Sequence, residues 1–174
     1  LGSSDIGVMD TSQVAALNAT QLATLSTDSI AALSTDQLAQ VTTTELNALS
    51  AAQVNAITTD GIQSLGSSRL NALLNSQFTS LKTGQVQALS TSQIANLANA
   101  KLQVLSNAQI GAISTTDMAV LTSAQMALLS VQQLAAVGTQ QVNALSTNAI
   151  AAFSATQAKA LSVGQLTNLS TTGA

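Results

Sequence analysis

The chain has 174 residues and a formal net charge of −3, and only 6% of its residues are charged, against roughly 25% in an ordinary soluble domain. It contains no Cys, His, Trp, Tyr or Pro, so it lacks the side chains that usually build disulfides, zinc sites and catalytic triads. Its four basic residues do not cluster, which argues against nucleic-acid binding. No stretch approaches the ~20 apolar residues of a membrane span.

An eight-residue unit recurs twenty-one times from Asp5 to Thr172 without insertion or deletion. Positions are numbered from its commonest first residue, Gln, so that residues 53–60 (QVNAITTD) form one copy. Position two is a large apolar residue in twenty copies, with Ala158 as the exception, and position five is one in all twenty-one. Such strict self-similarity dictates the architecture. We predict a single continuous array over residues 1–174.

The apolar spacing of three and then five residues excludes one long helix. Eight residues overshoot two helical turns by roughly 80°, so the apolar stripe would rotate off any single face. In a strand, positions two and five would point to opposite faces, and the Ala-rich positions three and four lack β-branched residues. A β-solenoid therefore remains the less favoured alternative to a helix that is broken once in every octad.

The residue types at positions five, six, one and two match a helix start. Position six is Ser, Thr, Asp, Asn or Gly in eighteen copies, and these residues favour helix N-caps. Position one, three residues later, is Gln in thirteen copies, which completes a capping box. The apolar residues at positions five and two form the matching hydrophobic staple. The sequence predicts an all-α solenoid of very short helices, about two turns and seven residues each, one per octad.

In chain order, the predicted caps at position six run from Asp10 to Ser170, one every eight residues. At each cap one helix ends and the next begins, and we call this point a corner. Three corners in the middle of the chain depart from the capping pattern, at Leu74, Lys82 and Ala98. All seven acids lie at a cap or in a first helical turn, where the helix dipole favours negative charge. The bases do not follow this rule, since Arg69 and Lys101 occupy position one.

The two ends keep the repeat phase. Leu1 fits position five, and residues 173–174 fit positions one and two of another copy. Solenoids usually finish in atypical capping repeats, and neither end has one. We expect the chain to be a window of a longer array, with end-to-end joining of units as the alternative.

A search for chemistry yields no catalytic, cofactor-binding or metal site. Asp28 and Asp36 share a position in adjacent octads and could share a cation if the segments stack, but two exposed acids that favour helix dipoles explain them better. Position seven is Thr in eleven copies, which suggests an ice-binding or polysaccharide-binding ladder, yet Ala51, Asn99 and Val163 interrupt it. We expect no enzyme activity, no cofactor and no small-molecule substrate.

The phrase at residues 88–94 (ALSTSQI) returns at residues 32–38 and, with Ala149 in place of Gln, at residues 144–150. It resembles repeat arrays of very large bacterial secreted and surface proteins, which are often labelled adhesin-like or haemolysin-like. The resemblance implies an extracellular or cell-surface location and a role in attachment or a biofilm matrix. The chain lacks the Gly-Gly-x-Gly-x-Asp calcium repeats that often accompany that class, which puts calcium-driven folding in doubt.

Two functions remain open at this point. The first is a non-enzymatic extracellular structural protein, a rod, stalk or filament whose octads associate with neighbouring repeats or with other copies. The second is a solenoid scaffold that binds a protein or peptide along one face. The second predicts a mutation-sensitive cluster on exposed positions three, seven and eight, but those positions carry small and varied residues.

Overall fold

The computed structural model describes residues 2–170, and this part of the chain is all-helical, with twenty-one short helices and no strand. The all-α prediction is confirmed, and the β-solenoid alternative is wrong for these residues. The helices are α1 Ser3–Val8, α2 Thr11–Ala15, α3 Ala19–Ala23, α4 Thr27–Ala31, α5 Thr35–Leu38, α6 Thr43–Ala48, α7 Ala51–Ala56, α8 Thr59–Ser64, α9 Ser67–Ala72, α10 Asn75–Thr79, α11 Thr83–Gln87, α12 Thr91–Ala95, α13 Asn99–Val104, α14 Asn107–Ala112, α15 Thr115–Ala119, α16 Ser123–Ala127, α17 Val131–Ala135, α18 Thr139–Asn143, α19 Thr147–Ala151, α20 Ala155–Ala160 and α21 Val163–Ser170.

The helices fall into two compact units, Leu1–Leu89 with α1 to α11 and Ser90–Ala174 with α12 to α21. Each unit is built in the same way. The repeat phase of the sequence runs through residue 90 unchanged. That the whole array forms one continuous domain stays a prediction.

Every helix from α2 to α20 begins at the predicted corner, position six of the octad. At a typical corner, Ser50 is extended, and its hydroxyl accepts a hydrogen bond from the Gln53 backbone N–H at 3.2 Å. The Gln53 side-chain oxygen accepts in return from the Ser50 N–H at 2.8 Å. Two otherwise unpaired amides are thus satisfied at each turn of the chain, which is why helices this short can start at all.

The weak corners keep half of this arrangement. Leu74 and Lys82 have no side-chain cap, but Oε1 of Gln77 and of Gln85 accepts from the Leu74 and Lys82 backbone N–H groups, each at 2.8 Å. Ala98 forms neither half of the capping box, because its own side chain cannot cap and position one of the next octad is Lys101. The residue at position one therefore helps to define the corner even where position six does not.

The helices are shorter than predicted. From α1 to α20 they span four to six residues rather than about seven. In many octads the residue at position five is already extended, as at Leu49 and Leu65, because it serves as the residue before the next cap. One residue cannot hold helical and extended backbone angles together, so each helix ends one to three residues earlier than predicted.

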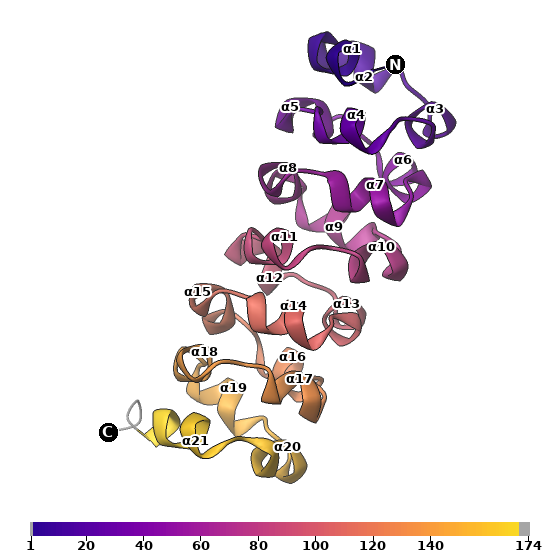
Figure 1. Ribbon diagram of the computed structural model, residues 1–174. Coiled ribbons are helices and arrows are strands. Elements are labelled where there is room, and N and C mark those ends of the chain that lie inside the picture. The colour runs from indigo at the N-terminus through magenta and orange to yellow at the C-terminus, as the bar shows by residue number, and fades with distance from the viewer. Residues whose placement is uncertain (1, 171–174) are drawn as a thin grey trace. The chain divides into compact units, whose positions relative to one another are not determined.

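Successive helices wind so that each one packs on the third helix before it. In unit 1, α4 packs on α1 and α7, and α5 on α8; in unit 2, α18 packs on α15 and α21 (Figure 1). Side-chain hydrogen bonds between turns join residues 28 to 31 positions apart. A separation of 28 residues is three and a half octads, so one turn of either unit holds between three and four octads.

The core of each unit consists of the two apolar positions of the octad. In unit 1 every position-two residue is at most 1% exposed, from Ile6 to Val86. Position five is also buried in most octads; Met9 and Leu17 in the first turn are half-buried. Buried side chains of this size contribute on the order of 2 kcal/mol each, and that burial needs a neighbouring turn.

Candidate functional site

The glutamine at position one of the octad donates hydrogen bonds to the turn before it, and we call this contact the glutamine tie. The Gln77 side-chain oxygen caps its own helix, while Nε2 of the same side chain donates to the backbone oxygens of Leu46 and Leu49 at 2.8 and 2.7 Å. Those oxygens belong to positions two and five of an earlier octad, at the C-terminal end of α6. A single amide thus satisfies a helix start and a helix end on adjacent turns.

The same tie recurs in both units. Nε2 donates to backbone oxygens 28 to 31 residues earlier, and the glutamines themselves are at most 8% exposed. They are Gln37, Gln53, Gln77 and Gln85 in unit 1 and Gln125, Gln133, Gln141, Gln157 and Gln165 in unit 2. Buried amides therefore connect successive turns in each unit.

The tie accounts for Arg69, one of the bases that did not fit the dipole rule. Arg69 occupies position one, and its Nη1 lies 3.5 Å from the backbone oxygen of Leu38, 31 residues earlier. It thus places a donor where glutamine usually stands. Lys101 occupies the same position and is 7% exposed. Burial lowers the pKa of the Lys101 ammonium below its ordinary value of 10.5.

Sequence reasoning missed this inter-turn role of position one, because the capping box alone accounted for the glutamine. One signal was present: Gln occurs thirteen times at position one and Glu once, at Glu45. Either residue completes a capping box, but only the amide also donates. Glu45 caps the Thr42 N–H at 2.7 Å through Oε2.

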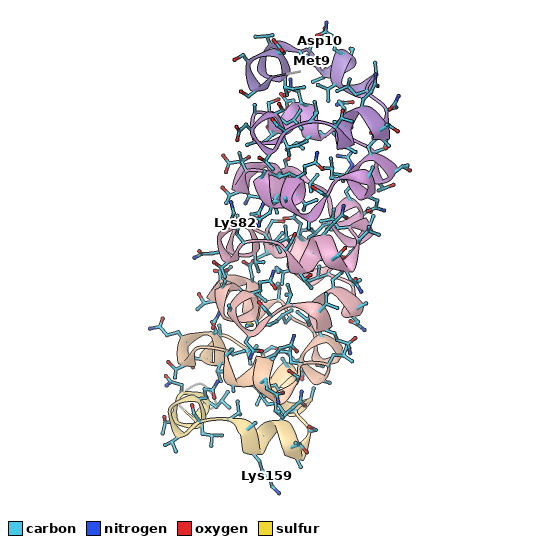
Figure 2. All side chains as sticks on the ribbon, turned by 45° about the vertical axis from the view of Figure 1, so that its right-hand side comes forward. Met9, Asp10, Lys82 and Lys159 are labelled. Atoms are coloured by element: carbon cyan, nitrogen blue, oxygen red, sulfur yellow. The ribbon has the colours of Figure 1, made fainter. Side chains whose placement is uncertain are left out.

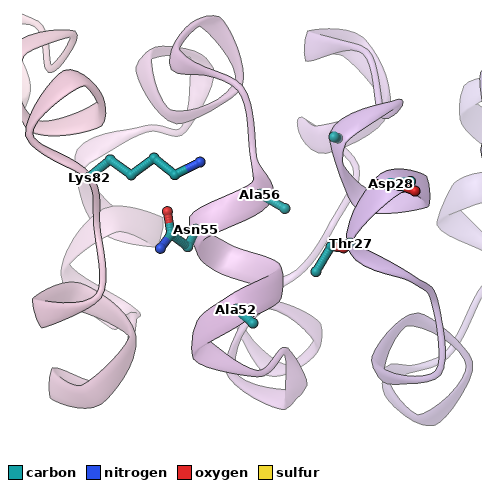
Figure 3. A pocket seen from close by; sticks show the side chains of 7 residues that line it. Thr27, Asp28, Ala52, Asn55, Ala56 and Lys82 are labelled. Carbon is teal, nitrogen blue, oxygen red and sulfur yellow. The ribbon is translucent and has the colours of Figure 1, made fainter.

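Unit 1 has a surface hollow of about 400 Å³ that is lined by Thr27, Asp28, Ala31, Ala52, Asn55, Ala56 and Lys82. These residues come from α4, from α7 and from the corner before α11. The Lys82 side chain extends over Asn55, and Asp28 lies on the far side of α7 (Figure 3). Asn55 Oδ1 is buried without a hydrogen-bond partner. The lining of the hollow thus contains the ammonium of Lys82, the carboxylate of Asp28 and three alanines.

The two acids that share a position in adjacent octads lie on different helices. Asp28 and Asp36 are exposed residues in the first turns of α4 and α5. No group of three or more potential metal ligands exists within residues 2–170. No helix in this part of the chain has the length and apolarity needed to cross a bilayer.

Part of the chain matches the model of a known repeat family. Residues 6–43 and 30–67 match the ALTTAQ repeat family. Over these residues the chain is similar to the ALTTAQ repeat. The six letters of that name correspond to positions four to eight of one octad and position one of the next, as in residues 32–37 (ALSTDQ). The two matches start 24 residues apart, which is three octads. The match confirms an octapeptide repeat array. No curated protein matches the chain.

Proposed function

We propose that this chain is a non-enzymatic structural repeat protein that forms part of an extracellular rod, stalk or filament for surface attachment or a matrix. The observation that carries the proposal is the repeated glutamine tie. Each turn is held to the one before it by the same apolar pair and the same buried amide, so length is added in identical steps. The resemblance to repeats of large bacterial surface proteins supports the location.

A partner-binding scaffold is the second candidate, and the hollow beside α7 is the observation that favours it. A peptide could place its carboxylate near Lys82 and its ammonium near Asp28, which lie on opposite sides of α7. Both side chains are exposed, so each contact would be worth little on its own. The structural role is therefore the better supported of the two.

Small-angle scattering tests the structural role. A compact globule of this length has a radius of gyration of about 16 Å. A rod made of stacked octads has a clearly larger value, with a scattering profile typical of an elongated particle. A radius near that of a globule would contradict the proposal. Antibody labelling of intact cells tests the location, which requires the repeat to be accessible without permeabilisation.

A further inference from the structure

We propose that the hollow of unit 1 that lies over α7 binds a saccharide segment of two rings, one of which carries a uronate carboxylate. The proposal rests on the proposed role in attachment or a matrix, and it names the class of matrix component that unit 1 holds, an acidic polysaccharide. Three features carry it: a set of polar side chains without partners, the order of donors and acceptors across the hollow, and a departure from the capping pattern at Lys82.

The hollow lies on the side of unit 1, away from its first and last turns. α4 packs on α1 and on α7, and α7 packs on α4 and on α10, so both helices of the hollow have neighbouring turns on either side. The floor is low because α7 presents Ala52 and Ala56 there, and about 400 Å³ is open above them. This volume is at the lower end of the ~300–1,000 Å³ of small-ligand pockets, so the occupant is a short segment.

Four polar side chains line the hollow, and none of them has a partner within residues 2–170. The Lys82 ammonium and the Asp28 carboxylate form no ion pair there, and the Thr27 hydroxyl and the Asn55 amide form no hydrogen bond. Most buried polar groups in proteins are hydrogen-bonded, yet Asn55 Oδ1 is buried and unpaired. Polar groups without partners that gather in one hollow are typical of a ligand site.

Donors and acceptors are separated across the hollow. On one side the Lys82 ammonium only donates, and Asn55 leaves its amide nitrogen accessible, because its oxygen is the buried atom. Two donors, one of them charged, match the two oxygens of a carboxylate. On the other side the Asp28 carboxylate only accepts, and the Thr27 hydroxyl does either, so this side takes hydroxyl groups. The alanine methyl groups between them contact the C–H face of a sugar ring.

Length and rigidity select the class of ligand. Lys82 and Asp28 lie on opposite sides of α7 (Figure 3), and a helix with its side chains is about 10–12 Å wide. A single sugar ring or a free amino acid is too short to reach both, whereas a disaccharide spans them. An extended peptide of about three residues also spans them. Ordering each flexible peptide residue, however, costs more than an exposed ion pair returns, and rigid sugar rings avoid most of that cost.

Charge limits the occupant to one carboxylate in the hollow. Unit 1 contains six acids and two bases, so its formal charge is 2 − 6 = −4. A ligand with a negative charge on every ring places its second carboxylate near Asp28, and the net charge of the unit repels it further. A polysaccharide in which uronate rings alternate with neutral rings satisfies both sides of the hollow.

Lys82 breaks the capping pattern at the point where it lines the hollow. Position six usually holds a residue that caps the next helix, but Lys82 gives α11 no side-chain cap. Its side chain extends instead over Asn55, from the outer surface of unit 1 (Figures 2 and 3). Sequences break such local rules mainly at functional sites, where binding outweighs the stability that is lost.

Two-dimensional amide NMR of the whole chain tests the site by titration. The probe is a disaccharide of one glucuronate and one glucose ring, and its neutral match is the glucose disaccharide cellobiose. We expect saturable shifts confined to the amides of α4, α7 and the corner at Lys82. The acidic probe should bind at least about five-fold more tightly than cellobiose, and its binding should weaken as salt is added.

Three variants separate binding from folding. Lys82→Ser should remove the preference for the acidic probe while raising stability, because the serine restores a cap. Lys159→Ser removes an exposed base of unit 2 (Figure 2) and should bind both probes like the parent chain. Ala52→Leu fills the floor of the hollow and should abolish the binding of both disaccharides.

The proposal is overturned by an absence of saturable shifts, by equal binding of the two disaccharides, or by equal effects of Lys82→Ser and Lys159→Ser. Tighter binding of the tripeptide Glu-Ala-Lys than of the acidic disaccharide would overturn the saccharide assignment and favour the partner-binding scaffold. An elongated chain that binds neither disaccharide would leave the structural role standing and remove this inference. A compact chain that binds the acidic probe would remove the structural role and leave the site.

Discussion

At the residue scale, the position-one glutamine carries two separate functions in its two amide atoms. The oxygen is part of a local contact three residues long, and the nitrogen bridges about 28 residues of sequence. Both are buried in inner turns, where an unpaired amide or carbonyl costs about 1–3 kcal/mol. Substitution by glutamate separates the two functions, because it keeps the acceptor and removes the donor.

We expect Gln133→Glu to lower the free energy of unfolding by about 2–4 kcal/mol, because three backbone oxygens lose their donor and face a carboxylate. Urea denaturation at neutral pH measures the loss. We expect burial to raise the pKa of the new carboxyl in the folded state, so the loss is full above that pKa and shrinks as the pH falls from there to the unfolded value of about 4.3.

Gln21→Glu is the matched control for this change. Its capping box is the same, but it lies in the first turn and ties to no earlier turn of its own chain. We expect its effect on stability to stay within about 0.5 kcal/mol. Equal losses for the two variants would show that the capping box, rather than the inter-turn bond, carries the energy.

Lys101 gives a pH-dependent prediction. Burial lowers its pKa in the folded state, so the unfolded chain holds the proton more tightly. The resulting destabilisation is complete below the folded pKa and disappears as the pH rises through the unfolded value of about 10.4. Lys101→Gln should therefore raise stability at neutral pH and flatten the rise in stability toward alkaline pH. Denaturation curves collected across this range measure both effects, and parallel pH profiles would contradict the prediction.

At the scale of the element, each helix exists because of its two ends. Helices of four to six residues are far below the ~12–15 residues that are marginally stable in isolation. Their backbone groups are satisfied at the start by the capping box and at the end by the amide from the following turn. A corner is therefore a rigid structural unit, and its quality varies along the chain.

Substitution at position six can remove a side-chain cap or add one. Ser130 accepts from the Gln133 N–H at 3.1 Å, and Ser130→Ala should cost about 1 kcal/mol. Lys82 has no side-chain cap, so Lys82→Ser should gain about 0.5–1 kcal/mol by supplying one. Shifts of the urea midpoint in opposite directions, at constant m-value, are the expected outcome. A loss for Lys82→Ser would show that its lysine contributes more through the hollow than a cap would.

At the scale of the whole molecule, both units follow one rule: octads are interchangeable as long as the phase is kept. A glutamine at position one can tie to positions two and five about three and a half octads earlier, because every octad presents the same oxygens there. Stability is then set by nearest-neighbour turns rather than by one central core.

Deletions test this rule directly. Removing residues 125–132 takes out one whole octad, so every remaining cap, apolar residue and glutamine keeps its phase. We expect the shortened chain to retain its helical circular dichroism and a cooperative thermal transition. Removing residues 125–128 instead shifts the phase by half an octad and places polar residues where apolar ones were buried. That variant should lose the cooperative transition, and equal behaviour of the two deletions would contradict the rule.

The sequence by itself determined where each described helix begins, because capping boxes and staples join residues only three to five positions apart and are visible as a pattern. The predicted helices were too long, because the residue at position five is extended in many octads, where it precedes the next cap. The hollow beside α7 was not foreseen, because its lining includes Asp28 and Lys82, which lie 54 residues apart in the sequence and on opposite sides of α7.

Tertiary structure alone decided how many octads make a turn, and with it the partners of each glutamine nitrogen. A side chain such as Gln77 has one local acceptor role that its neighbours specify, but its donor role exists only once Leu46 and Leu49 are brought beneath it. The winding that brings them there comes from packing between turns, in which position-two side chains of one turn are covered by the next. Such contacts join residues about 28 positions apart, and an eight-residue pattern read along the chain does not contain that distance.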